Sequence, residues 1–177
     1  MLQVKENKKK ILELFFKFPL KNFYLREISR ETNIAMTSVK RYMGELIKEK
    51  LIVKISGGIY PTFKSNRDSD DGIFRFYKKL NIIEKLYTSG LLSFINDKCN
   101  PKCIILFGSS SRGEDIKGSD IDLFVQSSEI KLDLSKFEKN FGRKINLFFE
   151  SNFSRLNKEL KNNILNGIVL SGYIGVF

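Results

Sequence analysis

The 177-residue sequence predicts an α+β fold divided between two small domains. In the first third of the chain, apolar residues recur at spacings of three and four, and two strand-like runs around a Gly-Gly pair follow them. From residue 103 onward, short apolar runs alternate with helical patterns, which is typical of a small sheet covered by helices. The polar stretch SNRDSDDG, residues 65–72, separates the two patterns and marks a domain boundary.

These patterns define a first domain over residues 1–66, a linker with bridging helices over residues 67–100 and a second domain over residues 101–177. In the first domain, helices are predicted at residues 6–18, 24–32 and 36–50. The pair Gly57 and Gly58 then favours a tight hairpin turn between two strands. A bridging helix is predicted over residues 73–88. In the second domain we expect strands at residues 103–107, 120–126, 141–149 and 168–171, with helices at 134–141 and 152–166.

The positive charge of the chain is concentrated in its first third. The net charge is +11, and residues 1–66 hold 11 Lys and 3 Arg against 6 Glu, an excess of eight positive charges. The rest of the chain holds 17 basic and 14 acidic residues, an excess of three. This asymmetry favours a polyanion as the partner of the N-terminal domain.

The sequence carries no signal for a membrane. No apolar run approaches the roughly 18 residues that span a bilayer, and the N-terminus MLQVKENKKK lacks the apolar core of a secretory signal. We therefore expect a soluble, cytoplasmic protein without a membrane partner. The only cysteines are Cys99 and Cys103, and there is no histidine, so the four ligands of a usual structural zinc site are missing. Two reduced, inert thiols are expected; a redox bridge or a metal shared across a dimer are the alternatives.

The order of three helices and a hairpin carries a family resemblance. The stretch LREISRETNIAMTSVKRYMGELIKEKLIVKISGGIYP, residues 25–61, resembles the winged helix-turn-helix DNA-binding family. The resemblance implies that the start of the third helix enters the major groove and that the hairpin reaches phosphates or the minor groove. The implied DNA-binding residues are Thr37, Ser38, Lys40 and Arg41 on the helix, with Lys54 and Lys64 near the wing. A role in protein contacts alone is the alternative for such a module.

The second domain contains a segment with candidate phosphate-binding and metal-binding residues, ILFGSSSRGEDIKGSDIDLFV, residues 105–125. A strand that ends in Gly108 and Ser109 lets the backbone of the following turn approach a phosphate closely, because glycine lacks a side chain and serine donates a hydroxyl. Asp120 and Asp122 are separated by one residue, so both carboxylates project from one face of a strand. Such a pair suits Mg²⁺ or Mn²⁺. A phosphate cradle with a carboxylate pair is the minimum for metal-assisted nucleotidyl transfer.

At these residues the sequence resembles the DNA polymerase β-type nucleotidyltransferase superfamily, and within it the minimal nucleotidyltransferases of prokaryotes. The likeness covers roughly residues 101–171. It implies that Gly108 and Ser109 bind the triphosphate of an NTP and that Asp120 and Asp122 bind the catalytic metals. It also implies phosphate contacts for Arg112, for which capping of the short helix is the alternative reading. Lys117 is a weaker candidate, since solvation explains it.

The family's third carboxylate has no counterpart in this chain. The matching segment is GRKINLFFE, and Asn146 occupies the position where the family carries an aspartate that acts as general base or metal ligand. An amide is neutral and cannot take a proton from an attacking hydroxyl at neutral pH. Glu150 lies four residues further along, about 13 Å away on an extended strand. It is not expected to replace the missing carboxylate.

Two functions are compatible with these residues. The first is a DNA-binding enzyme that transfers NMP from NTP to an unidentified hydroxyl acceptor; the second is a catalytically impaired transcriptional regulator or antitoxin-like protein that binds DNA and nucleotide. The resemblance to minimal nucleotidyltransferases implies a helical toxin-type protein as one partner. A homodimer is expected, because symmetric operators are matched by two-fold proteins. A purely structural interaction module would leave the glycine-serine and aspartate patterns unexplained. The high Lys, Ile and Asn usage is typical of an AT-rich prokaryotic genome.

Overall fold

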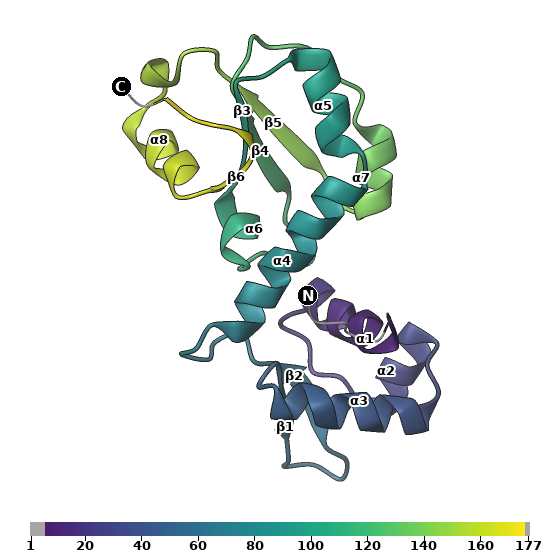
Figure 1. Ribbon diagram of the computed structural model, residues 1–177. Helices are drawn as coiled ribbons and strands as arrows, with labels where there is room; N and C mark the ends of the chain where they lie inside the picture. Colours follow the sequence, from purple (N-terminus) through teal and green to yellow (C-terminus); the bar gives the residue numbers. More distant parts are fainter. Residues whose placement is uncertain (1–5, 176–177) are drawn as a thin grey trace. The chain divides into compact units, whose positions relative to one another are not determined.

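The computed structural model describes residues 6–175 and confirms a mixed α+β fold (Figure 1). The chain divides into two compact units, one ending at Lys78 and the other beginning at Lys79. This division lies inside helix α4 (Ile73–Thr88), further along the chain than the boundary predicted at residue 66. The reason is that Phe74, in the first turn of α4, is fully buried in the N-terminal core, whereas Leu86 belongs to the core of the second unit.

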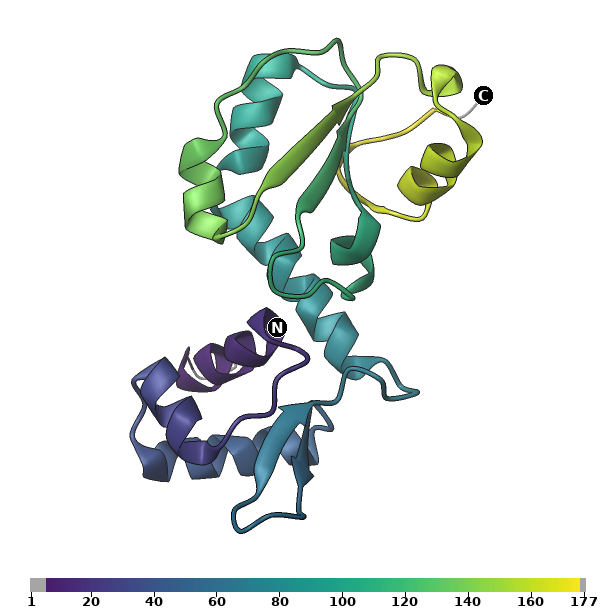
Figure 2. The same ribbon diagram turned by 180° about the vertical axis from the view of Figure 1, so that it is seen from behind.

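The first unit contains three helices followed by an antiparallel hairpin, in the predicted order (Figure 2). The observed helices begin and end within two residues of the predicted positions. The elements of this unit are α1 (Glu6–Lys17), α2 (Leu25–Thr32), α3 (Met36–Lys48), β1 (Ile52–Ile55) and β2 (Thr62–Ser65). Asn33 ends α2 in the left-handed conformation, with φ of 55°, and the chain turns there into α3.

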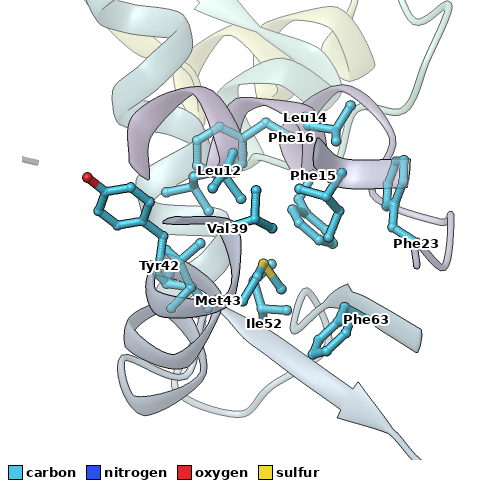
Figure 3. Packing of buried hydrophobic residues seen from close by; sticks show 14 of the residues in the cluster. Leu12, Leu14, Phe15, Phe16, Phe23, Val39, Tyr42, Met43, Ile52 and Phe63 are labelled. Atoms are coloured by element: carbon cyan, nitrogen blue, oxygen red, sulfur yellow. The ribbon is translucent and has the colours of Figure 1, made fainter. Parts of the chain in front are cut away.

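The apolar stripes of these helices meet in one core, part of which Figure 3 shows. Phe15 of α1 and Val39 of α3 are fully buried, and the ring of Phe23 packs edge-on against Phe15 at a centroid distance of 5.2 Å. Phe23 also exchanges two backbone hydrogen bonds of 2.8 Å with Phe63 of β2. The segment that enters α2 is therefore fixed against the hairpin. Helix α3 buries the face that carries Val39 in this core and exposes the opposite face to solvent.

The predicted tight turn at Gly57 and Gly58 is wrong. The ladder between β1 and β2 ends at the pair Ile55 and Thr62, so residues 56–61 form a longer connection. This connection contains Gly57, Gly58 and Pro61, residue types that are depleted in strands, and pairing stops before them. Ile59 at this tip is 93% exposed.

The second unit is built on a four-stranded sheet with strand order β5-β4-β3-β6. Strands β4 and β5 are parallel, and the other two neighbouring pairs are antiparallel. The elements of this unit that follow α4 are α5 (Leu91–Cys99), β3 (Cys103–Phe107), α6 (Gly108–Arg112), β4 (Ile121–Val125), α7 (Ser135–Phe141), β5 (Ile145–Phe149), the 3₁₀ turn η1 (Phe153–Arg155), α8 (Lys158–Leu165) and β6 (Ile168–Gly172).

Helices cover both faces of this sheet (Figure 1). Helices α5 and α7 and the end of α4 lie on one face, and their apolar side chains pack with Ile104, Leu123 and Ile145. The turn η1 and helix α8 lie on the other face, where Phe153 and Ile164 pack with Phe124. The alternation of side chains along each strand therefore divides the sheet into two buried layers.

Three predicted boundaries in this unit need correction. The strand expected from residue 120 begins at Ile121, so Asp120 precedes the ladder, and the strand expected from residue 141 begins at Ile145. The helix expected over residues 152–166 is two pieces. Each piece begins at its own asparagine cap: Asn152 Oδ1 accepts from the Ser154 N–H at 3.0 Å, and Asn157 Oδ1 accepts from the Leu160 N–H at 2.8 Å.

Both cysteines are free thiols, Cys103 buried in β3 and Cys99 half-buried at the end of α5. Burial raises the pKa of each thiol above its ordinary value, which disfavours the reactive thiolate. Within residues 6–175, no helix has both the length and the apolar character that crossing a membrane requires.

Candidate functional site

The site begins where β3 passes into α6. Gly108 is the first residue of α6 and has φ of +71°, a backbone conformation that favours glycine. A Cβ atom at this position would lie 2.7 Å from Oδ2 of Asp122, which is closer than real Cβ contacts allow. Phe107 and Asp122 are direct partners in the β3–β4 ladder, so the sheet itself brings this carboxylate onto the glycine. The positive φ of the turn favours glycine here, and any larger residue would also have to displace the Asp122 carboxylate.

The two aspartates converge on one neighbour across the sheet. Asp122 is the second residue of β4, Asp120 comes just before the strand, and Ile121 between them is fully buried on the opposite face. The side-chain amide nitrogen of Asn146 lies 2.9 Å from Asp122 Oδ1 and 3.2 Å from Asp120 Oδ2. One amide group therefore donates a hydrogen bond to each carboxylate, and the two carboxylates share a face as the alternation predicts.

Asn146 reaches this place through the strand register. It pairs with Asp122 in the parallel β4–β5 ladder, which puts it at the same height along the sheet as the carboxylate. Only the NH₂ end of an amide can meet two carboxylate oxygens favourably, because its carbonyl end is an acceptor. The amide thus places N–H hydrogens, which carry partial positive charge, between the two carboxylates without adding a net charge.

The three serines of α6 have different surroundings. Ser110 and Ser111 are buried, and their hydroxyls donate to the Asp120 carbonyl at 3.5 Å and the Gly108 carbonyl at 2.8 Å. Ser109 is half-buried, and its hydroxyl makes no side-chain hydrogen bond with any residue that the structure describes. Ser109 is therefore the serine of this turn with a hydroxyl open to a ligand.

Arg112 is exposed at the end of α6. Its Nε donates to Glu114 Oε2 at 2.8 Å, in an ion pair that water screens. The backbone N–H of Gly113, with φ of 70°, bonds the carbonyls of Ser109 and Ser110 and closes the helix. Helix capping thus comes from Gly113 and not from the Arg112 side chain. Lys117 lies in the exposed part of the loop that follows.

Arg143, which sequence reasoning missed, holds the loop that carries Asp120. Its guanidinium donates to the Ser119 carbonyl at 2.6 Å, Asp115 Oδ2 at 2.9 Å, Ser110 Oγ at 2.8 Å and the Asp120 carbonyl at 2.8 Å. The side chains of Arg143 and Asp115 are only 16% and 9% exposed. The sequence signal for this role is one arginine three residues before Asn146, which looks like any surface arginine until the fold brings the loop to it.

Glu150 lies at the other end of β5 and does not join the site. Its N–H bonds the carbonyl of Val125, the last residue of β4, at 3.4 Å. Its Oε1 accepts from the Asn152 N–H at 2.9 Å and so belongs to the cap of η1. Asn146, and not Glu150, is therefore the β5 residue beside the two aspartates.

The oxygen atoms at this site are of the kind that binds a hard cation such as Mg²⁺, but only two of the three side chains carry a negative charge. Across residues 6–175, no group of three or more Asp, Glu, Cys or His side chains gathers in the manner of a metal site. Asp120 and Asp122 offer carboxylate oxygens, and Asn146 has an amide oxygen if its side chain turns over. Mg²⁺ accepts one or two carboxylates with water and phosphate oxygens, so these residues fit Mg²⁺ when a phosphate ligand is present.

A second candidate surface lies on α3 in the N-terminal unit. Thr37, Lys40 and Arg41 are exposed and Ser38 is half-buried, while Lys54 and Lys64 are exposed on the hairpin. The guanidinium of Arg41 lies 4.6 Å from the ring centre of Tyr42. The residues Thr37, Arg41, Gly44 and Lys48 follow one another at the spacing of a single helix face. A Cβ atom added to Gly44 would meet nothing within 4 Å, so packing inside the unit does not require glycine there.

Comparison with known families bears on the second unit. Residues 90–173 match the family model described as "Polymerase beta, Nucleotidyltransferase", a range that includes Gly108, both aspartates and Asn146. No match to the chain is found among curated proteins or among solved structures. The family match supports a nucleotidyltransferase domain in the C-terminal part of the chain.

Proposed function

We propose that this chain, with its polymerase β-type nucleotidyltransferase domain, is a DNA-binding regulator that binds an NTP with Mg²⁺ or Mn²⁺ and transfers NMP poorly. The observation that carries this proposal is the position of Asn146, whose amide donates to both Asp120 and Asp122. The family match over residues 90–173 supports the nucleotide ligand.

In this proposal, Gly108 and Ser109 bind the triphosphate. Gly108 has no side chain of its own to keep a phosphate from the backbone of the turn, and the Ser109 hydroxyl is open to a phosphate oxygen. Arg112 is exposed at the end of the same turn and can exchange its screened ion pair with Glu114 for a phosphate. These three residues are the proposed nucleotide-binding set.

Asp120 and Asp122 are the proposed metal ligands. A bound Mg²⁺ or Mn²⁺ would neutralise phosphate charge and polarise the phosphorus for attack. The two aspartates would hold the cation, and the Asn146 amide would have to release or turn over to admit it. Each carboxylate loses one hydrogen bond in this exchange, so cation affinity is lower than with a third carboxylate at position 146.

In this proposal the site lacks a general base for the transfer reaction. A general base must lie within hydrogen-bond reach of the attacking hydroxyl and accept its proton. Asn146 holds the position where the family's third carboxylate stands, and a neutral amide does not accept a proton at neutral pH. The nucleotide would then act as a ligand whose presence is sensed, with little turnover.

The N-terminal unit is the proposed DNA reader, as a winged helix-turn-helix. Helix α3 would place Thr37, Ser38, Lys40 and Arg41 in the major groove, and Lys54 on the hairpin would reach the backbone or the minor groove. Support comes from the exposed face of α3 and from the excess of eight positive charges in residues 1–66. Two copies of the chain would match a two-fold symmetric operator. Nucleotide would change DNA affinity to the extent that the two DNA-binding states differ in nucleotide affinity.

An active enzyme is the second candidate function. The presence of Gly108 and Ser109 beside the carboxylates of Asp120 and Asp122 favours it, because these residues form a phosphate-binding turn next to a cation-binding pair. Asp120 and Asp122 would then be catalytic, and the acceptor hydroxyl would lose its proton to solvent or to a group of the acceptor itself. A helical toxin-type protein or a nucleic-acid end would supply the hydroxyl.

Equilibrium binding of NTP tests the shared part of both functions. The full chain is titrated with each labelled NTP, with and without Mg²⁺, and compared with the double variant Asp120→Asn, Asp122→Asn. Binding should require Mg²⁺ and should be lost in the double variant. The control is Asp97→Asn with Glu129→Gln, which removes the same charge at exposed positions away from the aspartate pair. Equal binding by the wild type and the Asp120, Asp122 double variant would remove these two residues from the site.

A further inference from the structure

Asp120 and Asp122 are held in different ways. Asp122 lies within the ladder and pairs with residues of both β3 and β5. Asp120 precedes the first ladder hydrogen bond, in which the Ile121 N–H donates to the Lys144 carbonyl at 2.9 Å. The segment from Glu114 to Asp120 contains no helix or strand. The sheet therefore does not by itself fix the position of the Asp120 carboxylate.

Side chains supply the missing constraint, and Arg143 is at their centre. One guanidinium nitrogen, Nη2, contacts both Ser110 Oγ and the Asp120 carbonyl at 2.8 Å. The other groups, Nε and Nη1, hold the Ser119 carbonyl and Asp115 Oδ2. Arg143 itself lies just before β5, two residues from the strand that carries Asn146. One side chain thus connects β5, the loop and α6.

We infer that Arg143 is a positioning residue for the proposed site: it sets the Asp120 carboxylate relative to the phosphate-binding turn of α6. A guanidinium is planar and presents five donors in a fixed fork, so one side chain can hold several acceptors at set directions. Burial of the Arg143–Asp115 pair makes these contacts geometrically stricter than surface ion pairs. The role as support for cation and nucleotide binding rests on the function proposed above.

The test uses the full chain and four variants. Arg143→Ala removes the fork, and Arg143→Lys keeps the charge but loses the fork geometry. Ser110→Ala removes one partner and leaves the arginine in place. Lys144→Ala is the matched control, because it removes a positive charge from the exposed neighbouring residue, whose carbonyl still accepts from Ile121. Backbone hydrogen exchange is measured across the chain, and Mn²⁺ binding in the presence of NTP is measured by electron paramagnetic resonance.

Arg143→Ala and Arg143→Lys should speed backbone hydrogen exchange in residues 115–121. The rest of the four-stranded sheet and the N-terminal unit should keep wild-type exchange rates. Ser110→Ala should give a smaller increase in the same segment. Mn²⁺ affinity should fall by about 10–100-fold in both arginine variants, as is usual for loss of an outer-shell partner. Lys144→Ala should leave both measurements unchanged. A general loss of protein stability would instead change exchange throughout the second unit.

Wild-type exchange rates at residues 115–121 in both Arg143→Lys and Ser110→Ala would overturn the positioning role. If the wild type binds Mn²⁺, equal Mn²⁺ affinity in the wild type and in the arginine variants would also overturn it. If Arg143→Ala fails to fold, the Arg143→Lys and Ser110→Ala results decide. If the wild type binds no Mn²⁺ with NTP but exchange still rises locally, the function proposed above fails and the placement of Asp120 by Arg143 stands.

Discussion

Asn146 Nδ2 lies 2.9 Å from Asp122 Oδ1 and also contacts Asp120 Oδ2 at 3.2 Å, so a single amide satisfies two adjacent carboxylates. Without a positive group between them, two carboxylates this close would repel each other. A cation would lie between them in a nucleotidyltransferase site, whereas here the neutral Asn146 amide directs its N–H hydrogens, which carry partial positive charge, to both carboxylates. The pair is thereby stabilised in the absence of metal and lacks the third negative charge that would draw a metal in.

Replacing Asn146 by Asp should make the stability of the second unit depend on Mg²⁺. The change removes two hydrogen bonds and adds a third negative charge, so without divalent cation the free energy of unfolding should fall by about 1–3 kcal/mol. Mg²⁺ at millimolar concentration should restore it, because three carboxylates form a better cation site. Thermal unfolding with Mg²⁺ and with chelator measures both effects. The exposed change Asn163→Asp is the control, and an equal Mg²⁺ response in the two variants would contradict the assignment.

Gly108→Ala should destabilise the second unit more than a positive φ alone explains. Gly118, with φ of +88° and nothing within 4 Å of an added Cβ, provides the comparison. Gly118→Ala should cost about 1–2 kcal/mol from backbone conformation. Gly108→Ala should cost about 1–3 kcal/mol more, because its Cβ would press on the Asp122 carboxylate. Urea unfolding of the two variants measures the difference, and equal losses would mean that the carboxylate moves aside freely.

Gly44→Ala should separate folding from DNA binding. Alanine is the better helix former by about 1 kcal/mol, and the added methyl meets no neighbour, so the first unit should become more stable. On the face of α3 that is proposed to enter the major groove, the same methyl hinders close approach, so DNA affinity should fall. Thermal unfolding and a DNA titration are made on the same sample. A more stable variant with unchanged affinity would place this part of α3 outside the DNA interface.

Replacing Lys40 and Arg41 together by Ala should weaken DNA binding and flatten its dependence on salt. Each lost phosphate contact changes the slope of log K against log salt by about 0.9, so a change of up to roughly two is expected. The pair Lys136→Ala and Lys139→Ala on α7 removes the same charge from the other unit and should keep the wild-type slope. If the Lys40, Arg41 variant retains that slope as well, the start of α3 is not in contact with phosphates.

The sequence predicts well those helices and strands that depend on the local spacing of apolar residues. The apolar period predicts α4 at its observed residues, and continuous apolar runs predict β3 and β4 to within one residue, because each element buries one stripe or one short run. The split between η1 and α8 is missed, since two asparagine caps there outweigh a weak helical period. The long connection at Gly57 is missed because a Gly-Gly pair favours a two-residue turn, whereas the β1–β2 pairing stops at Ile55 and Thr62.

The candidate site shows the same division. The sequence spacing predicts that Asp120, Asp122 and Asn146 lie on one face of the sheet, because strand alternation and the β4–β5 register decide where these side chains lie. The contacts of Arg143 cannot, since they join residues 23 to 33 positions apart through a loop with no regular structure. That Asn146 donates to both carboxylates also required the geometry, because the sequence shows only an asparagine where the resemblance implies an aspartate.

The most direct measurement compares transfer by the wild type and by Asn146→Asp under the same conditions. Each purified protein is incubated with α-labelled NTP and Mg²⁺ or Mn²⁺, and bound nucleotide, labelled protein or nucleic acid, and released pyrophosphate are followed together. We predict that both proteins retain nucleotide and that pyrophosphate release is at least about 10²-fold faster in Asn146→Asp, the usual contribution of a positioned base. Measurable transfer at equal rates in the two proteins would contradict the proposal and identify the wild type as an active nucleotidyltransferase, and the absence of transfer in both would contradict the role given to position 146.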